Sequence, residues 1–213
     1  MGEKRTIPKP LRKALDWDVV TTDKFVKFVD KKYGPLCRYN GIMKGLEISC
    51  HGIPWLIGTG TFIFLIENSG FRQLMVNILI ALVLDIIVVA VLKAVTRRRR
   101  PTDNKDDMFA TIQMDKFSFP SGHSTRAVML CVLLPLQYNL WILFTISLIA
   151  WGTAVSVSRV LLCRHHILDV AVGSIVGILE AFVMSLLWLS PESAQWLVNF
   201  FLDETQVGAS YDV

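Results

Sequence analysis

The chain has 213 residues, of which 53% are hydrophobic, and its mean hydropathy is +0.47. This composition excludes an ordinary soluble domain and indicates a single polytopic membrane domain. The formal net charge is only +4, from 22 Lys and Arg residues against 18 Asp and Glu residues, and we expect membrane lipids and no nucleic acid among its partners.

The N-terminal segment, residues 1–45, precedes the strongly apolar part of the chain and contains one amphipathic stretch. Within residues 22–33, Phe25, Phe28 and Val29 share one helical face. Four lysines frame that face: Lys24, Lys27, Lys31 and Lys32. The stretch is too charged to span a bilayer, so it predicts an interfacial amphipathic helix, with a surface helix packed on protein as the alternative.

Five apolar runs follow and predict a transmembrane domain at residues 46–189. The runs are Leu46–Ile66, Leu74–Leu92, His123–Leu136, Leu140–Val157 and Ile167–Leu189. A bilayer requires about 20 residues, so the third run is long enough only if its polar start belongs to the helix. We therefore predict an all-α bundle of about five transmembrane helices plus the N-terminal interfacial helix.

The two ends of the chain carry further signals. The start, MGEKRT, fits the M-G-x-x-x-[ST] pattern for N-myristoylation of Gly2. Residues 190–213 predict a C-terminal interfacial segment at Trp196–Leu202, followed by an acidic tail.

Three polar clusters lie at the ends of the apolar runs, where charge is costly in lipid. They are Lys93–Pro101, Phe119–Ala127 and Ser158–Asp169. With five spans, the ends of the second and fourth runs and the starts of the third and fifth lie on one side of the membrane. The three clusters can therefore meet at one site.

The residue types in these clusters predict a site for a tetrahedral oxyanion, most naturally phosphate. Lys93, Arg100 and Arg159 supply fixed cations with several N–H donors. Ser121 and Gly122 precede a predicted helix, where free backbone amides and the helix dipole favour an anion. Gly122 also lets the backbone approach a ligand closely.

Two adjacent histidines in the third cluster are distinguished by their spacing from an aspartate. Asp169 lies four residues beyond His165, on the same face of a helix, so it can accept from one ring nitrogen and set the tautomer. His166 points about 100° away and lacks such a partner. We therefore predict that His165 is the reactive histidine.

Two acids, Asp85 and Glu180, fall inside the second and fifth runs. For each we expect an interhelical hydrogen bond, with a place along a lipid path as the alternative. Gly173 and Gly177 form a small-x-x-x-small pair that favours close helix packing.

The spacing of these residues resembles the type 2 phosphatidic acid phosphatase superfamily. Its motifs K-x6-R-P, P-S-G-H and S-R-x5-H-x3-D appear in order, and the resemblance covers about Leu46–Leu189. The matching positions are Lys93, Arg100, Pro101, Pro120–His123, Ser158, Arg159, His165 and Asp169.

This resemblance implies phosphoryl transfer through a covalent intermediate, with no metal and no cofactor. It implies that His165, oriented by Asp169, is the nucleophile and that His123 is the general acid and base. The implied phosphate-binding residues are Lys93, Arg100, Ser121, Gly122 and Arg159. One alternative is a soluble vanadate haloperoxidase, which would have a similar anion site, but five spans argue against it. A second alternative is an inactive scaffold protein, but no motif position is missing from this sequence.

Within the superfamily, stretches such as LEISCHGIPW and SRVLLCRHHILD are similar to polyisoprenoid diphosphate phosphatases, also called presqualene diphosphate phosphatases or type 6 phospholipid phosphatases. This implies farnesyl, geranylgeranyl or presqualene diphosphate as substrate. The alternative is a glycerolipid or sphingoid monophosphate, such as phosphatidic or lysophosphatidic acid. Arg126 and Arg164 are candidate contacts for a second phosphate, although they, like Arg97–Arg99, could equally form a solvated patch. Arg164 is also a departure, because many members have Gly-Val before the nucleophile.

Charge asymmetry predicts the orientation in the membrane. Five spans place 21 of the 22 Lys and Arg residues on the side of the polar clusters, leaving only Arg72 on the other. Positive residues near span ends are retained in the cytosol. We therefore expect a cytosolic site and a lumenal C-terminus, in the endoplasmic reticulum and nuclear envelope.

Overall fold

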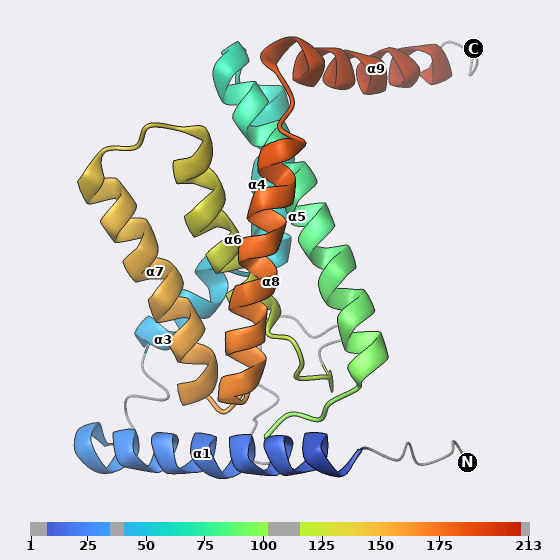
Figure 1. The fold of residues 1–213 in the computed structure, drawn as a ribbon. Coiled ribbons are helices and arrows are strands. Elements are labelled where there is room, and N and C mark those ends of the chain that lie inside the picture. Colours follow the sequence, from blue (N-terminus) through green and yellow to red (C-terminus); the bar gives the residue numbers. More distant parts are fainter. Residues whose placement is uncertain (1–7, 35–40, 102–115, 210–213) are drawn as a thin grey trace.

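The computed structural model describes residues 8–34, 41–101 and 116–209, with side chains described through residue 201. Gly2 and the last four residues of the predicted tail lie outside this part. Its regular elements are all helices (Figure 1). They are α1 (Lys9–Tyr33), α3 (Gly41–Ser49), α4 (Gly52–Leu65), α5 (Ser69–Thr96), α6 (Gly122–Gln137), α7 (Ile142–Leu161), α8 (Ile167–Leu186) and α9 (Pro191–Ala209). The predicted all-α membrane bundle is confirmed.

The helices follow the predicted apolar runs. Among the described residues, α5, α7 and α8 are each long and apolar enough to cross a membrane, and α3 with α4 makes a fourth, bent unit. The remaining run, the third in chain order, is α6, which has 16 residues and is shorter than the roughly 20 that a bilayer requires. It begins at Gly122, so the polar start does belong to the helix.

The first run is not the single straight helix that the sequence predicted. It is bent by 50° between α3 and α4. In a continuous helix the nitrogen of Pro54 would donate to the Cys50 carbonyl, but proline has no N–H. The Cys50 carbonyl instead accepts from Arg126 Nη1 at 3.1 Å, and His51 Nδ1 caps α4 by accepting from the Ile53 N–H. The bend therefore turns a backbone acceptor toward α6.

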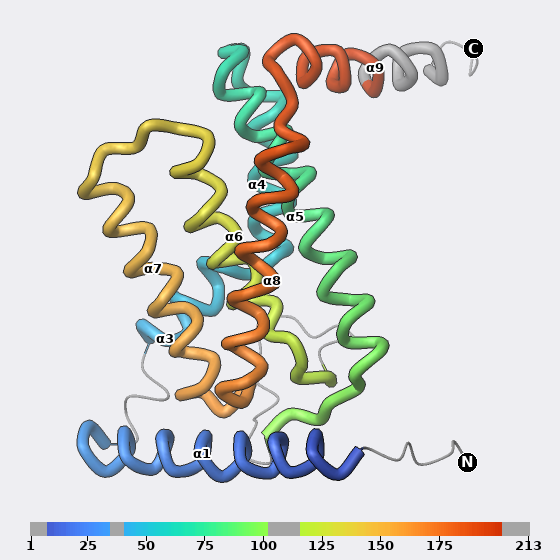
Figure 2. The backbone as a smooth tube through the Cα atoms, viewed as in Figure 1, coloured from blue at the N-terminus to red at the C-terminus, as the bar shows by residue number. Residues whose placement is uncertain are grey.

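The core of the bundle is the contact of α6 with α7 and α8, which run beside it (Figure 2). The predicted close approach at the two α8 glycines is confirmed. A Cβ on Gly173 would lie 2.9 Å from the Ser121 carbonyl oxygen, and one on Gly177 would overlap the Thr125 carbonyl oxygen. The backbones of α6 and α8 can approach so closely only because both positions lack a side chain.

The two predicted intramembrane acids have different environments. Asp85 on α5 accepts from Arg126 Nη2 on α6 at 2.6 Å, so its interhelical bond is confirmed. The same prediction is wrong for Glu180, because neither carboxyl oxygen has a hydrogen-bond partner among the described residues. The two terminal nitrogens of Arg126 are already bonded to Asp85 and the Cys50 carbonyl.

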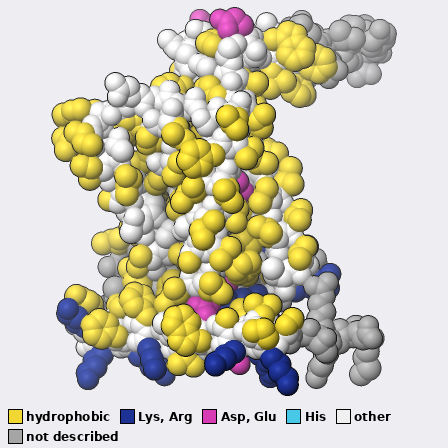
Figure 3. All heavy atoms as spheres, in the orientation of Figure 1, with side chains coloured by type: hydrophobic (Ala, Val, Ile, Leu, Met, Phe, Trp, Pro, Cys, Tyr) yellow, Lys and Arg dark blue, Asp and Glu magenta, His cyan; other side chains and the backbone are white. Residues whose placement is uncertain are grey.

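The outer surface of the bundle is apolar, and its two ends are covered by helices that lie across it (Figures 1 and 3). Large hydrophobic side chains such as Ile87, Phe144 and Leu179 are more than half exposed. At one end lies α1, with Lys and Arg side chains on its outer side, and at the other lies α9. This apolar belt is the surface expected of an integral membrane protein.

We expect Gly177→Ala to destabilise the protein, because its methyl group would overlap the α6 backbone. Overpacking of this kind costs about 1–3 kcal/mol. Gly60→Ala is the matched control, since a Cβ there meets nothing within 4 Å. Thermal unfolding of the purified proteins in detergent should show a lower Tm for Gly177→Ala alone. Equal Tm values for the two variants would contradict the close packing.

Candidate active site

A cavity of about 260 Å³ lies between α4, α5 and the start of α6. Its polar lining consists of His51, Lys93, Arg100, Gly122, His123, Arg126 and His165. Its apolar lining includes Ile53, Leu56, Ile86, Val89 and Ala90. The cavity thus joins histidines and cations from all three polar clusters to an apolar wall formed by α4 and α5.

The chain brings the first cluster to the cavity by turning at the end of α5. Lys93 lies in the last turn of α5, where the helix dipole favours a cation. Arg97 ends the helix in the left-handed conformation, at φ 49°. The chain then pairs with the segment before α6 through Arg99 and Phe117, and Arg100 reaches the cavity wall.

The second cluster contributes the N-terminus of α6. The Ser121 hydroxyl oxygen caps the helix, accepting from the Ser124 Oγ at 3.0 Å and more weakly from the Ser124 N–H at 3.4 Å. Ser121 is fully buried and does not line the cavity, whereas Gly122 and His123 do. The serine predicted to hold phosphate therefore shapes the helix start in this structure. His123 Nε2 has no hydrogen-bond partner among the described residues.

The predicted phosphate-binding residue Arg159 also lies outside the cavity lining, although it is close to the site. Its Nη1 donates to Glu47 on α3 at 3.1 Å, and both side chains are buried. Its Nη2 has no partner among the described residues. A buried guanidinium requires an acid, and Glu47 meets that requirement while leaving one donor unused.

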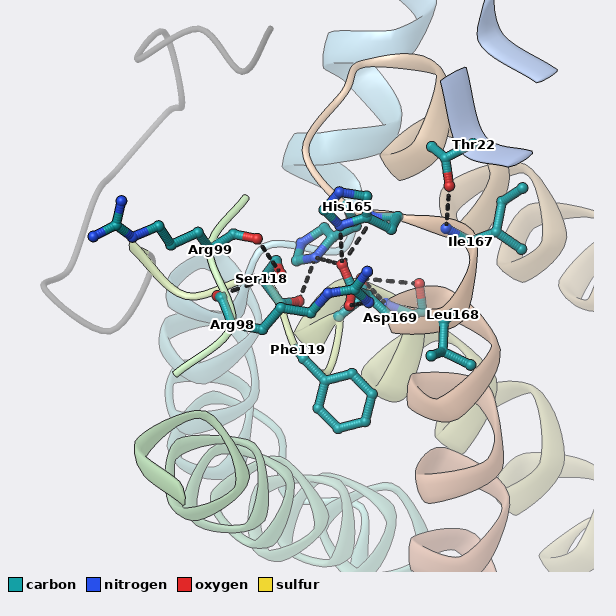
Figure 4. Close-up of polar contacts among 12 residues, drawn as sticks. Thr22, Arg98, Arg99, Ser118, Phe119, His165, Ile167, Leu168 and Asp169 are labelled. Carbon is teal, nitrogen blue, oxygen red and sulfur yellow. Dashed lines mark hydrogen bonds and ion pairs between the residues drawn. The ribbon is translucent and has the colours of Figure 1, made fainter. Parts of the chain in front are cut away.

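His165 is held by a backbone carbonyl and not by the predicted aspartate. Its Nδ1 lies 2.6 Å from the Ser118 carbonyl oxygen but 3.9 Å from Asp169 Oδ2 (Figure 4). The helical-face argument fails because α8 begins at Ile167, so His165 lies before the helix. A carbonyl only accepts, and the proton is therefore on Nδ1, which leaves a lone pair on Nε2.

The prediction that His166 lacks a carboxylate partner is wrong. His166 is the N-cap of α8 and forms a capping box with Asp169. The His166 backbone N–H donates to Asp169 Oδ2 at 2.8 Å, and the ring Nδ1 lies 3.2 Å from the same oxygen. His166 thus stabilises the start of α8 and does not line the cavity.

The electrostatic environment keeps His165 neutral. Burial, and then the nearby charges of Arg100, Lys93 and Arg159, hold its pKa well below the usual range, while the Ser118 carbonyl acts in the opposite direction. A neutral ring with a protonated Nδ1 is the form in which Nε2 can act as a nucleophile.

Sequence reasoning missed several residues of the site. The His51 ring packs edge-on against the His123 ring at 6.0 Å, and a histidine inside an apolar run is a signal that could have identified it. Ser118 could not be found, because it acts through its backbone. Arg98 was grouped with the arginines that could form a solvated patch, yet it bridges Asp169 and Asp18 at 2.6 and 2.7 Å.

The two candidate contacts for a second phosphate differ in position. Arg126 lines the cavity, although two of its nitrogens are bonded to Asp85 and to the Cys50 carbonyl. Arg164 is 3% exposed and does not line the cavity. Within the described part of the chain, His, Cys, Asp and Glu side chains form no group of three that could hold a metal ion.

Residues 74–190 match the family model of the PAP2 superfamily. The chain is 32% identical over 139 residues to the probable lipid phosphate phosphatase beta of Arabidopsis thaliana, over 54% of this chain and 65% of that protein. In structure it is similar to LpxE of Aquifex aeolicus, with a TM-score of 0.53 and 20% identity. That match covers 76% of this chain and 92% of the solved one, and at this identity it shows a shared fold.

Proposed function

The chain belongs to the PAP2 superfamily, and on this basis we propose that it is an integral membrane phosphatase that hydrolyses polyisoprenoid diphosphates through a phosphohistidine intermediate. The observation that carries this proposal is the cavity, whose lining combines His123 and His165 with Lys93 and Arg100. Apolar side chains of α4 and α5 form the rest of the lining. A lipid phosphate has the same two parts, a charged head and a hydrocarbon chain.

In the proposed reaction, His165 Nε2 attacks phosphorus while the bond from phosphorus to the leaving oxygen breaks. His123 donates a proton to that oxygen. The now neutral His123 then takes a proton from water, whose oxygen attacks the phosphohistidine and releases phosphate and His165. Acid–base catalysis of this kind contributes about 10²–10⁴-fold, and the covalent route divides one difficult displacement into two.

Fixed cations bind the phosphate oxygens in this proposal. Lys93 and Arg100 lie in the cavity wall, and the Gly122 N–H is at the N-terminus of α6, where an anion is favoured. The unused Nη2 of Arg159 is a further donor. Ser121 contributes by capping α6. These groups take the place of the Mg²⁺ that neutralises charge in other phosphoryl transfers.

The preference for a diphosphate rests on Arg126. Arg98 is engaged by two acids, and Arg164 does not line the cavity, whereas Arg126 does line it and could meet a second phosphate there. Its Nε has no partner among the described residues. A glycerolipid or sphingoid monophosphate would use the same histidines and is the alternative substrate class.

We expect the purified protein to have a higher kcat/KM on farnesyl, geranylgeranyl or presqualene diphosphate than on phosphatidic acid. The physical reason is the additional charge that Arg126 can neutralise. Phosphate release from a matched panel of these lipids in detergent micelles measures the preference. A clear preference for phosphatidic or lysophosphatidic acid would establish the alternative.

The roles of the two adjacent histidines can be separated by substitution. His165→Ala should abolish turnover and the acid-labile phosphoenzyme, because no neighbouring group can replace an oriented nucleophile. His166→Ala should retain both and lower stability by about 1 kcal/mol, the usual cost of a lost helix cap.

Turnover and ³²P labelling should persist in excess EDTA. The reverse behaviour of the two variants, or activity that requires Mg²⁺, would contradict the mechanism.

We further propose that the site faces the cytosol and that the C-terminus is lumenal, in the endoplasmic reticulum and nuclear envelope. The support is that α1, with its Lys and Arg side chains, lies at the end of the bundle where α5 ends and α8 begins, and α9 lies at the other end (Figures 1 and 3). Positive side chains favour the cytosolic leaflet. Such a site would accept prenyl diphosphates made in the cytosol.

Protease treatment of intact microsomes tests this orientation. A tag placed after Val213 should be protected, and a tag placed before Lys4 should be cleaved. Detergent must expose both tags to the protease as the control. Protection of the N-terminal tag with cleavage of the C-terminal one would reverse the assignment.

A further inference from the structure

A buried carboxylate on the peripheral helix α1 is hydrogen-bonded to the candidate site. Asp18 is 3% exposed, although most of α1 lies on the surface. Its Oδ2 accepts from Arg98 Nη2 at 2.7 Å, and its Oδ1 accepts from the Leu168 N–H at 2.9 Å. A carboxylate is buried at low cost only where such partners replace its hydration, so both bonds constrain its position.

The contact of Asp18 with Leu168 is at the start of α8. Ile167 and Leu168 are the first two residues of that helix, and their N–H groups have no acceptor within it. Asp18 accepts from Leu168, and Thr22, one turn further along α1, accepts from Ile167 at 3.1 Å (Figure 4). The negative charge of Asp18 also suits the positive end of the helix dipole. Helix α1 thus satisfies two N–H groups of α8 that the capping box of His166 and Asp169 does not reach.

The contact of Asp18 with Arg98 leads to the nucleophile proposed above. Arg98 donates to Asp18 with one nitrogen and to Asp169 Oδ1 with another, at 2.6 Å. The backbone carbonyl of Arg98 accepts from the Ser118 N–H at 2.8 Å. The Ser118 carbonyl in turn holds His165 Nδ1 at 2.6 Å. Asp18 is therefore joined to the His165 ring through two residues.

We propose that Asp18 is a positioning residue, which holds Arg98 and the first turn of α8 so that Ser118 keeps the His165 ring aligned with phosphorus. This inference rests on the proposed function, in which His165 is the nucleophile. Docking of α1 alone would not require a charge at this position, because Val26 on the same face of α1 already packs against Val160 and Cys163. The peripheral helix is then part of the scaffold of the active site.

Asp18→Asn is the most direct test, because it preserves shape and removes the charge that Arg98 contacts. We expect kcat to fall roughly 10- to 100-fold, as a small misplacement of a reacting group can cause. The KM of Asp18→Asn should stay within about twofold of the wild-type value, because the cations that bind phosphate are unchanged. The rate of phosphoenzyme formation should fall together with kcat.

Two control variants separate positioning from a general loss of structure. Asp23→Asn removes the same charge from an exposed site on α1 and should leave kcat unchanged. Val26→Ala weakens the docking of α1 and should lower Tm while leaving the kcat of the folded protein within about twofold. A fall in kcat for Val26→Ala as large as that for Asp18→Asn, or a normal kcat for Asp18→Asn, would overturn the proposal.

A measurement that does not depend on activity distinguishes failure of this proposal from failure of the proposed function. The chain has four histidines, so their ring ¹⁵N signals can be assigned with single His→Ala variants. We expect His165 to be the Nδ1–H tautomer in the wild type and a mixture of tautomers in Asp18→Asn. An unchanged His165 signal would overturn the positioning role. If the His165 tautomer changes in Asp18→Asn as expected, but the wild type hydrolyses none of the lipid phosphates, only the proposed function is contradicted.

Discussion

The location of the candidate site depends on how closely α6 approaches α8. Gly173 and Gly177 present no side chains at this contact, so the backbone of α6 lies against α8. At that separation the Ser121 N–H donates to the Asp169 carbonyl at 3.0 Å. The start of α6 is thereby placed beside the loop that carries His165. Between membrane helices, small residues allow the van der Waals contact that the hydrophobic effect does not supply.

Paired charges hold the remaining helices in place around this contact. The observed pairs are Arg126 with Asp85, Arg159 with Glu47, and Arg98 with both Asp18 and Asp169. Each joins different elements, because a cation buried away from water needs an acid from a neighbouring segment. These cations therefore have fixed positions before any ligand binds. Such preorganised charge is the arrangement that stabilises a developing oxyanion most effectively.

The sequence predicted the bundle well because spans are defined by length and hydropathy, which are local properties. It also predicted that the three polar clusters share one side of the membrane. At the site, its main error concerned the partner of Asp169. The argument treated His165 as part of a regular helix, but α8 begins two residues later, so the spacing of four residues did not place the two side chains on one face. Helix ends are set by capping contacts, and two of these come from the distant helix α1.

By itself, the sequence determined the all-α membrane class, the order of the spans and the residue types that gather at one end of the bundle. Composition, apolar run length and motif spacing carry that information without reference to distant contacts. Only the tertiary structure decided which atom holds His165, which acid meets Arg98 and where Arg159 is anchored. Those choices depend on a backbone carbonyl of Ser118 and on side chains brought together from α1, α3 and α8. Hydrogen bonds between segments so far apart in the chain leave no periodic pattern in the sequence.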